Sequence, residues 1–181
     1  MINIKPPEII KNILSDSDFD FLKNHIINKD IKNMTYESSM GRFLYTDSVL
    51  SNYCEKLLEF ARSHFDSKTL LPTYTLFCHY EGPDAKLFKH KDDNACTYTL
   101  DLCLYQTEPW DLYIEDIPYT LFPNEAIAFY GEDQEHWREK FPNPKSQNVG
   151  MVFFHFVEPD HWWFTKGKDY MEQSRKSNFE Q

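Results

Sequence analysis

The sequence lacks the hallmarks of membrane, secreted and zinc-binding proteins. No apolar run approaches the roughly 20 residues that a membrane-spanning helix needs. Prolines and charges interrupt residues 1–12, so this segment contains no signal-peptide core. The four cysteines show neither CxxC pairs nor zinc-finger spacing. We therefore expect a cytoplasmic protein whose cysteines are reduced and mostly buried.

Positive charge is also scarce in this sequence. Lys and Arg number 19 against 29 Asp and Glu, which gives a net charge of −10. Nucleic acids and anionic membranes both attract basic surfaces. We therefore expect neither of them as a partner, and the sequence leaves the oligomeric state open.

The chain does contain enough apolar material for a core. Of its 181 residues, 41% are hydrophobic and 17% aromatic, which is typical of a globular domain rather than a disordered chain. We expect a single domain over residues 1–181. Its expected parts are a helical N-terminal part at 1–66, a strand-rich core at 70–160 and a polar C-terminal tail at 165–181.

Two helices are expected in the N-terminal part. Ser15, with Asp18 three residues later, predicts the start of the first helix. The second helix should begin near Thr46 or Asp47, because apolar residues then recur at helical spacing. Between the helices, residues 31–43 are expected to form a loop that contributes to a lid.

From residue 72 onward the apolar period changes to two, which is the period of β-strands. In "TYTLDLCLY", residues 97–105, large apolar side chains alternate with Thr97, Thr99, Asp101 and Cys103. Short strands, among them one at "YTLF", residues 119–122, continue to residue 157 with no helical pattern between them. This pattern predicts an α+β, mainly β protein built as an antiparallel sandwich or barrel, and it disfavours a Rossmann or TIM fold.

A group of potential metal ligands lies at the edge of this strand series. If the chain is extended at "HKDDN", residues 90–94, the side chains of His90 and Asp92 point to the same side. His136 follows several strands later. Two imidazoles and one carboxylate on one face of a barrel form the facial triad that binds non-haem Fe(II). A surface hydrogen-bonded pair and a solvated histidine would leave the same pattern.

The segments around these residues resemble the 2-oxoglutarate- and Fe(II)-dependent oxygenases, and most closely their prolyl-4-hydroxylase-like branch. The matching text is "LPTYTLFCHYEGPDAKLFKHKDDNACTYTLDLCLY", "PWDLYI", "LFPNEAIAFYGEDQEHWRE" and "VGMVFFHFV". The resemblance implies a double-stranded β-helix, or jelly roll, buttressed by the N-terminal helices. It also implies that His90, Asp92 and His136 bind Fe(II), with 2-oxoglutarate and O₂ as cosubstrates.

The resemblance assigns further residues to the cosubstrate. Tyr80 matches a family tyrosine that precedes the first histidine, so it is a candidate hydrogen-bond donor to 2-oxoglutarate, and it is equally a candidate core residue. The family usually opens its last strand with an Arg or Lys that pairs with the distal carboxylate, whereas Asn148 falls near that position here. Arg138 is our first candidate for the missing cation and Lys145 the second. A solvated surface charge is the plainer interpretation of both.

The implied activity is hydroxylation of a small polar metabolite, an amino acid or a peptidyl residue, with release of succinate and CO₂. The presence of Asp92 disfavours halogenation, because the related halogenases lack that carboxylate. Arg42 is a candidate for binding a substrate carboxylate, and equally for pairing with a nearby acid. The alternatives are a non-catalytic jelly-roll or cupin-like protein that binds a metal or ligand, and a cupin-type metal enzyme that is not an oxygenase.

Overall fold

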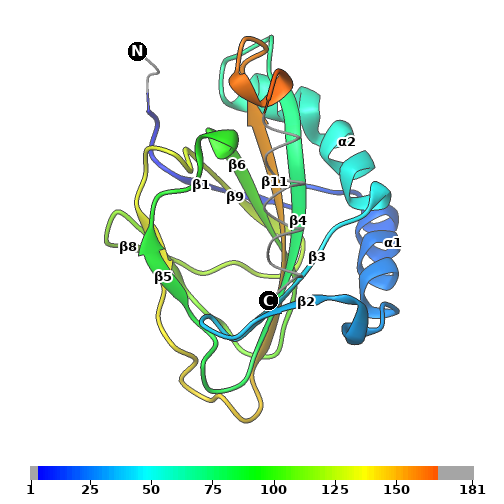
Figure 1. Cartoon of the computed structure of the whole chain (residues 1–181), viewed down its shortest axis with the longest axis vertical. Coiled ribbons are helices and arrows are strands. Elements are labelled where there is room, and N and C mark those ends of the chain that lie inside the picture. Colours follow the sequence, from blue (N-terminus) through cyan, green and yellow to red (C-terminus); the bar gives the residue numbers. More distant parts are fainter. Residues whose placement is uncertain (1–3, 167–181) are drawn as a thin grey trace.

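Two antiparallel β-sheets face each other, and two helices cover the outer side of the larger sheet (Figure 1). The computed structural model describes residues 4–166 of the chain. The larger sheet has seven strands in the order β1-β9-β6-β11-β4-β3-β2, and the smaller has four in the order β5-β10-β7-β8. No helix among the described residues is long and apolar enough to span a bilayer.

The elements have the following bounds. The larger sheet contains β1 (Glu8–Lys11), β2 (Thr35–Glu37), β3 (Arg42–Tyr45), β4 (Leu71–Glu81), β6 (Tyr98–Gln106), β9 (Glu125–Phe129) and β11 (Asn148–Val157). The smaller sheet contains β5 (Leu87–His90), β7 (Leu112–Ile114), β8 (Ile117–Tyr119) and β10 (His136–Arg138). The α-helices are α1 (Asp16–Ile27) and α2 (Ser48–His64), and short 3₁₀ helices lie at Ile31–Asn33, Asn94–Cys96 and Trp162–Phe164.

The chain winds between the two sheets in the manner of a jelly roll. From β4 to β7 each successive strand changes sheet, β8 stays beside β7, and β9, β10 and β11 alternate again. Long-range antiparallel pairs such as β4 with β11 and β5 with β10 follow from this winding. The sequence prediction of an antiparallel, mainly β jelly roll with N-terminal helices is confirmed.

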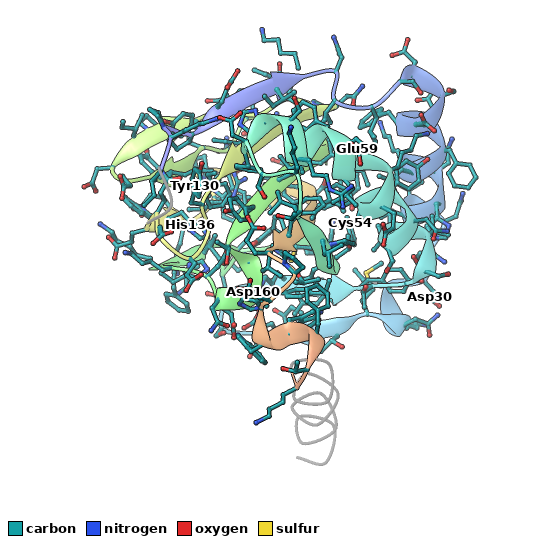
Figure 2. All side chains as sticks on the ribbon, turned by 90° about the horizontal axis from the view of Figure 1, so that it is seen from above. Asp30, Cys54, Glu59, Tyr130, His136 and Asp160 are labelled. Atoms are coloured by element: carbon teal, nitrogen blue, oxygen red, sulfur yellow. The ribbon has the colours of Figure 1, made fainter. Side chains whose placement is uncertain are left out.

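Two apolar cores hold the layers together. Leu100 and Leu102 of β6 point toward the helices and pack with Leu50 and Leu57 of α2, while Cys103 of β6 points into the space between the sheets. The predicted alternation along β6 therefore separates the two cores. Seen from above, side chains fill both spaces, with Cys54 of α2 on the helix side and His136 on the smaller sheet (Figure 2).

The helix starts follow the predicted caps. The side chain of Ser15 accepts a hydrogen bond from the backbone N–H of Asp18, and that of Asp47 accepts one from Leu50. The apolar stripe of α2 is buried except for Phe60, which is half-buried.

The N-terminal part is less helical than predicted, because it also contributes β1, β2 and β3 to the larger sheet. The prediction that residues 31–43 form a loop is wrong. It forms a short 3₁₀ helix followed by the β2–β3 hairpin, which pairs with β4 and turns through Gly41 at a positive φ of 54°. Strands of three or four residues are too short for a period of two to stand out.

Two smaller differences concern the strands and the tail. The strand predicted at residues 119–122 lies earlier, at β8, and overlaps the prediction only at Tyr119. The predicted C-terminal tail, residues 165–181, lies outside the described residues except for Thr165 and Lys166.

Asn124 joins the N-terminal segment to the barrel. Its side chain accepts a hydrogen bond from the N–H of Leu14 at 3.1 Å and donates one to the carbonyl of Leu14 at 2.9 Å. The residue is buried and has a positive φ of 67°, a conformation that asparagine tolerates better than most residues.

We predict that Asn124→Ala lowers the free energy of unfolding by about 2–4 kcal/mol, because two buried backbone groups lose their partner and alanine disfavours the positive φ. Chemical denaturation measures this loss. Asn124→Gly removes the same hydrogen bonds without the backbone penalty, so it should cost about 1 kcal/mol less. An alanine variant as stable as the wild type would contradict the assigned role.

Candidate metal centre

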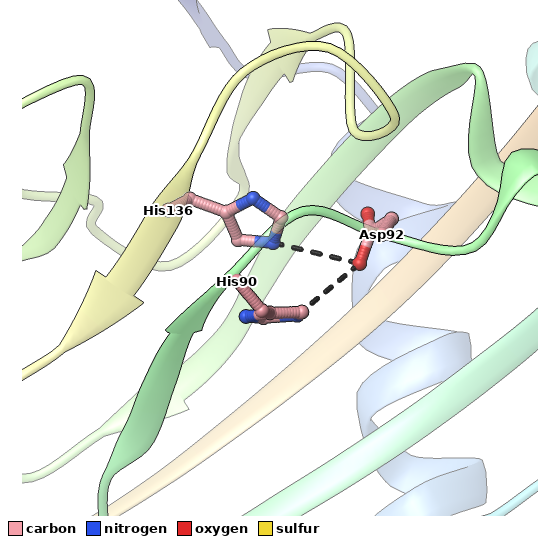
Figure 3. Close-up of side chains that lie close together, drawn as sticks. All are labelled: His90, Asp92 and His136. Atoms are coloured by element: carbon pink, nitrogen blue, oxygen red, sulfur yellow. Dashed lines mark ion pairs between the residues drawn. The ribbon is translucent and has the colours of Figure 1, made fainter.

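The three predicted ligands meet between the sheets, at one end of the hollow there. His90 is the last residue of β5 and His136 the first of β10, and the two strands pair with these residues directly opposite each other. The Oδ1 atom of Asp92 lies 3.4 Å from Nε2 of His90 and 3.5 Å from Nε2 of His136 (Figure 3). The prediction that these three side chains converge is therefore confirmed.

The backbone next to β5 explains the position of Asp92. Its N–H donates a hydrogen bond of 2.8 Å to the carbonyl of Gly131. A Cβ atom on Gly131 would overlap Oδ2 of Asp92 and would also lie 2.7 Å from the carbonyl oxygen of Cys96. Only glycine allows the chain after β9 to come this close to the carboxylate.

Hydrogen bonds to carbonyl groups fix the orientation of both imidazoles. Nδ1 of His90 lies 2.7 Å from the carbonyl of Phe88, and Nδ1 of His136 lies 3.0 Å from that of Gln134. A carbonyl only accepts hydrogen bonds, so each Nδ1 carries a proton. Each Nε2 is then the ligand atom, as in metal sites where an outer partner sets the tautomer.

The charges of the three residues are coupled. Burial alone would raise the pKa of Asp92, but hydrogen bonds that His136 and His90 donate when a proton occupies Nε2, where a metal ion would otherwise bind, hold it well below its ordinary value. Burial alone would lower the pKa of His90, but its hydrogen bond to Asp92 raises it. Asp92 is thus an anion at neutral pH, held between two nitrogen ligands.

This donor set fits a divalent first-row metal ion. The ligand atoms of the three residues lie within 4.8 Å of one another. They face a hollow of about 120 Å³ that is also lined by Arg42, Tyr74, Leu76, Leu87, Asp101, Phe153 and His155. Two histidines and one carboxylate with open positions on the remaining side match the facial triad of non-haem Fe(II) sites.

Solved structures with the same fold include several enzymes. The viral collagen prolyl hydroxylase of Paramecium bursaria Chlorella virus-1, solved as its 2-oxoglutarate complex, aligns with a TM-score of 0.60 at 16% identity, over 86% of this chain and 98% of that one. A prolyl-4-hydroxylase from Pseudomonas putida gives 0.64 at 12% identity, over 84% and 92%. HygX from Streptomyces hygroscopicus, with nickel and 2-oxoglutarate bound, gives 0.66 at 8% identity, over 88% and 85%.

The protein has the double-stranded β-helix fold of the 2-oxoglutarate- and Fe(II)-dependent oxygenases. No protein-family model matches its sequence, and no curated protein sequence does. The likeness is therefore one of structure at low identity, and it shows the fold.

Arg138 is a buried cation that lacks an anionic partner. It is 4% exposed and lies two residues after His136 on β10. Its guanidinium donates a hydrogen bond of 2.6 Å to the carbonyl of Trp110, stacks over that indole, and approaches the sulphur of Met151 on β11. Among residues 4–166 no carboxylate forms an ion pair with it. A buried cation without a counter-ion is costly, so this position suits an anionic ligand.

Tyr80 lies close enough to this cation to feel its charge, and it keeps its hydroxyl proton. The side chain is fully buried on β4, and burial raises its pKa to about 12, so it stays protonated. Nη1 of Arg42 donates a hydrogen bond of 3.2 Å to the Tyr80 hydroxyl oxygen, while Nε of Arg42 pairs with Glu37 at 2.6 Å. The oxygen of Tyr80 thus accepts from Arg42 and can donate its own proton to a third group.

The structure does not bring Lys145 to the triad. Lys145 is exposed and lines a different hollow, together with Tyr36, Glu81 and Asn148, beyond the far end of β4. Of the two predicted cations, only Arg138 enters the space between the sheets.

The sequence analysis missed several residues around the centre. His155 is buried in β11, lines the hollow, and its Nδ1 lies 3.1 Å from the carbonyl of Tyr74. The thiol of Cys96 lies 3.0 Å from the hydroxyl of Tyr74. Asp101 lines the hollow from β6. The period of two was the available signal, since it puts His155 and Asp101 on the inner faces of their strands.

We predict that Gly131→Ala weakens the binding of a divalent metal about 10- to 100-fold, because the added methyl group displaces the carboxylate of Asp92. Titration with Ni(II), followed by calorimetry, measures the change. Gly82→Ala is the control for loss of a glycine: a Cβ there meets nothing within 4 Å, and the backbone strain from its positive φ of 81° has no counterpart at Gly131. Equal nickel affinity in both variants would refute the role of Gly131.

Proposed function

We propose that the protein is an Fe(II)- and 2-oxoglutarate-dependent dioxygenase that hydroxylates its substrate and releases succinate and CO₂. The observation that carries the proposal is the arrangement of two sites in one barrel. His90, Asp92 and His136 form a metal-ligand triad, and Arg138 places a guanidinium that has no carboxylate partner among residues 4–166 between the same sheets.

The spacing of the two sites fits a short dicarboxylate. His136 and Arg138 are two residues apart on one strand, which corresponds to roughly 6.6 Å along the sheet. A five-carbon dicarboxylate that binds the metal through its oxo-acid end can reach Arg138 and Tyr80 with its other carboxylate. Of the three solved structures described above, two contain 2-oxoglutarate, and one of these also contains nickel.

Each residue then has a defined task. His90, Asp92 and His136 hold Fe(II), while Arg138 and Tyr80 bind the distal carboxylate of 2-oxoglutarate. The metal and cosubstrate, when bound, supply the oxidative decarboxylation and the oxygen atom that is transferred. The apolar side chains of Leu76, Leu87 and Phe153 keep bulk water from the hollow.

The substrate binds outside this hollow. A volume of about 120 Å³ is small beside the roughly 300–1,000 Å³ of typical ligand pockets. Metal and cosubstrate therefore occupy it, and a small polar metabolite, amino acid or peptidyl residue approaches from the open side. The N–H groups of Arg42 that Glu37 and Tyr80 do not use are available for an acidic group of that substrate.

The four cysteines are free and buried, which supports the expected cytoplasmic location.

We predict that the protein binds Fe(II) and 2-oxoglutarate without oxygen to give a weak visible charge-transfer band. In air, a suitable substrate should stimulate the release of succinate. His136→Ala should abolish the band, because the metal loses one of its three protein ligands. Absence of the band in the wild type would instead favour a non-catalytic metal- or ligand-binding jelly roll.

We further predict that Arg138→Met weakens 2-oxoglutarate binding to the nickel-loaded protein about tenfold or more, because the distal carboxylate loses charge-assisted hydrogen bonds. Lys145→Met removes the same charge at the exposed position and should leave the Kd unchanged. The metal-free Arg138→Met variant should be at least as stable as the wild type, since a buried unpaired cation is gone. If Lys145→Met had the larger effect on the Kd, Arg138 would not be the anchor.

A further inference from the structure

Asp101 is a buried carboxyl group without a partner. It lies in the middle of β6, is 6% exposed, and lines the same hollow as the metal-ligand triad. Within residues 4–166 its carboxyl group takes part in no hydrogen bond or ion pair. A buried polar group left unpaired costs free energy, so its position calls for a ligand that completes it.

The register of the sheet places Asp101 between the two ends of the proposed cosubstrate site. Thr99, two residues before it, lies beside Gly131 and therefore at the level of Asp92. Cys103, two residues after it, pairs with Met151, whose sulphur contacts Arg138. Asp101 thus lies on β6 between the level of the metal centre, two residues before it, and the level of the guanidinium, two residues after it.

The surroundings favour the neutral form of this carboxyl group. Burial is the main cause of a pKa well above the ordinary value of an aspartate, and the negative charge of Asp92 raises it further. The positive charge of Arg138 acts in the opposite direction but does not outweigh these effects. These effects favour the protonated acid, whose O–H group would face the hollow.

We propose that Asp101 is a positioning residue that donates a hydrogen bond from its carboxylic acid to a carboxylate oxygen of 2-oxoglutarate, and so holds the cosubstrate between the metal and Arg138. This inference rests on the proposed function. The inference adds the carboxylic acid of Asp101 to Arg138 and Tyr80, the two residues proposed to bind the same molecule.

The charges in the hollow support a neutral Asp101. A divalent metal ion and Arg138 are positive, whereas Asp92 and the 2-oxoglutarate dianion are negative, and together they balance. An ionised Asp101 would leave one excess negative charge in a buried site. A protonated Asp101 instead removes repulsion and supplies a hydrogen bond to a charged acceptor, which is stronger than one between neutral groups.

The test is calorimetric titration of 2-oxoglutarate into the Ni(II)-loaded wild type, Asp101→Asn and Asp101→Leu, which are similar in size. The asparagine amide still donates a hydrogen bond, so its Kd should stay within about threefold of the wild type. Leucine cannot donate, so its Kd should rise about tenfold or more. Nickel affinity and thermal unfolding of the same variants report any loss of the fold, and Asp101→Ala gives the same comparison if the leucine variant does not fold.

The outcomes separate this inference from the proposed function. If the wild type does not bind 2-oxoglutarate, the proposed function fails, and this inference fails with it. If the wild type and the leucine variant bind equally well, the role of Asp101 is refuted while the function stands. If the asparagine variant is as weak as the leucine variant, the carboxylate is needed as an anion, as it would be for binding an ammonium group, and the proposed donor role is refuted.

Discussion

The pairing of β5 with β10 is the constraint on which the whole site depends. These strands come from distant parts of the chain, and their register sets His90 opposite His136. A shift of one residue would turn one imidazole to the outer face of the smaller sheet. Arg138 lies two residues further along β10 and pairs with Leu87, beyond an irregularity in the register, so the same pair of strands positions both the metal ligands and the buried cation.

Two aspartates line the hollow in different surroundings. The carboxylate of Asp92 lies between two imidazoles, whereas Asp101 lies buried on β6, and the guanidinium of Arg138 lies outside the lining, against Trp110 and Met151. These surroundings shift the pKa values of the two aspartates in opposite directions. Hydrogen bonds from the histidines account for the first and burial for the second, which shows how local surroundings give one residue type two roles.

The sequence reveals a large part of this site for identifiable reasons. His90 and Asp92 share a face because extended chains repeat every two residues, and the strand alternation separates Leu100 and Leu102 from Asp101. His136 can be expected near His90 because a series of antiparallel strands that winds into a barrel brings distant strands side by side. The β2–β3 hairpin was not predictable from period, because its strands are too short, and it holds Arg42 against Tyr80. The choice between Arg138 and Lys145 depended on which side chain enters the core, and only tertiary packing decides that.

The position of β11 has a consequence for the folding of the chain. It is the last strand of the described residues, yet it lies in the middle of the larger sheet, between β4 and β6. During synthesis, β4 and β6 have no common neighbour until residues 148–157 have left the ribosome, so their inner edges stay unpaired until then. Closure therefore waits for contacts between residues far apart in sequence, which slows folding and leaves these strand edges open to aggregation until β11 is in place.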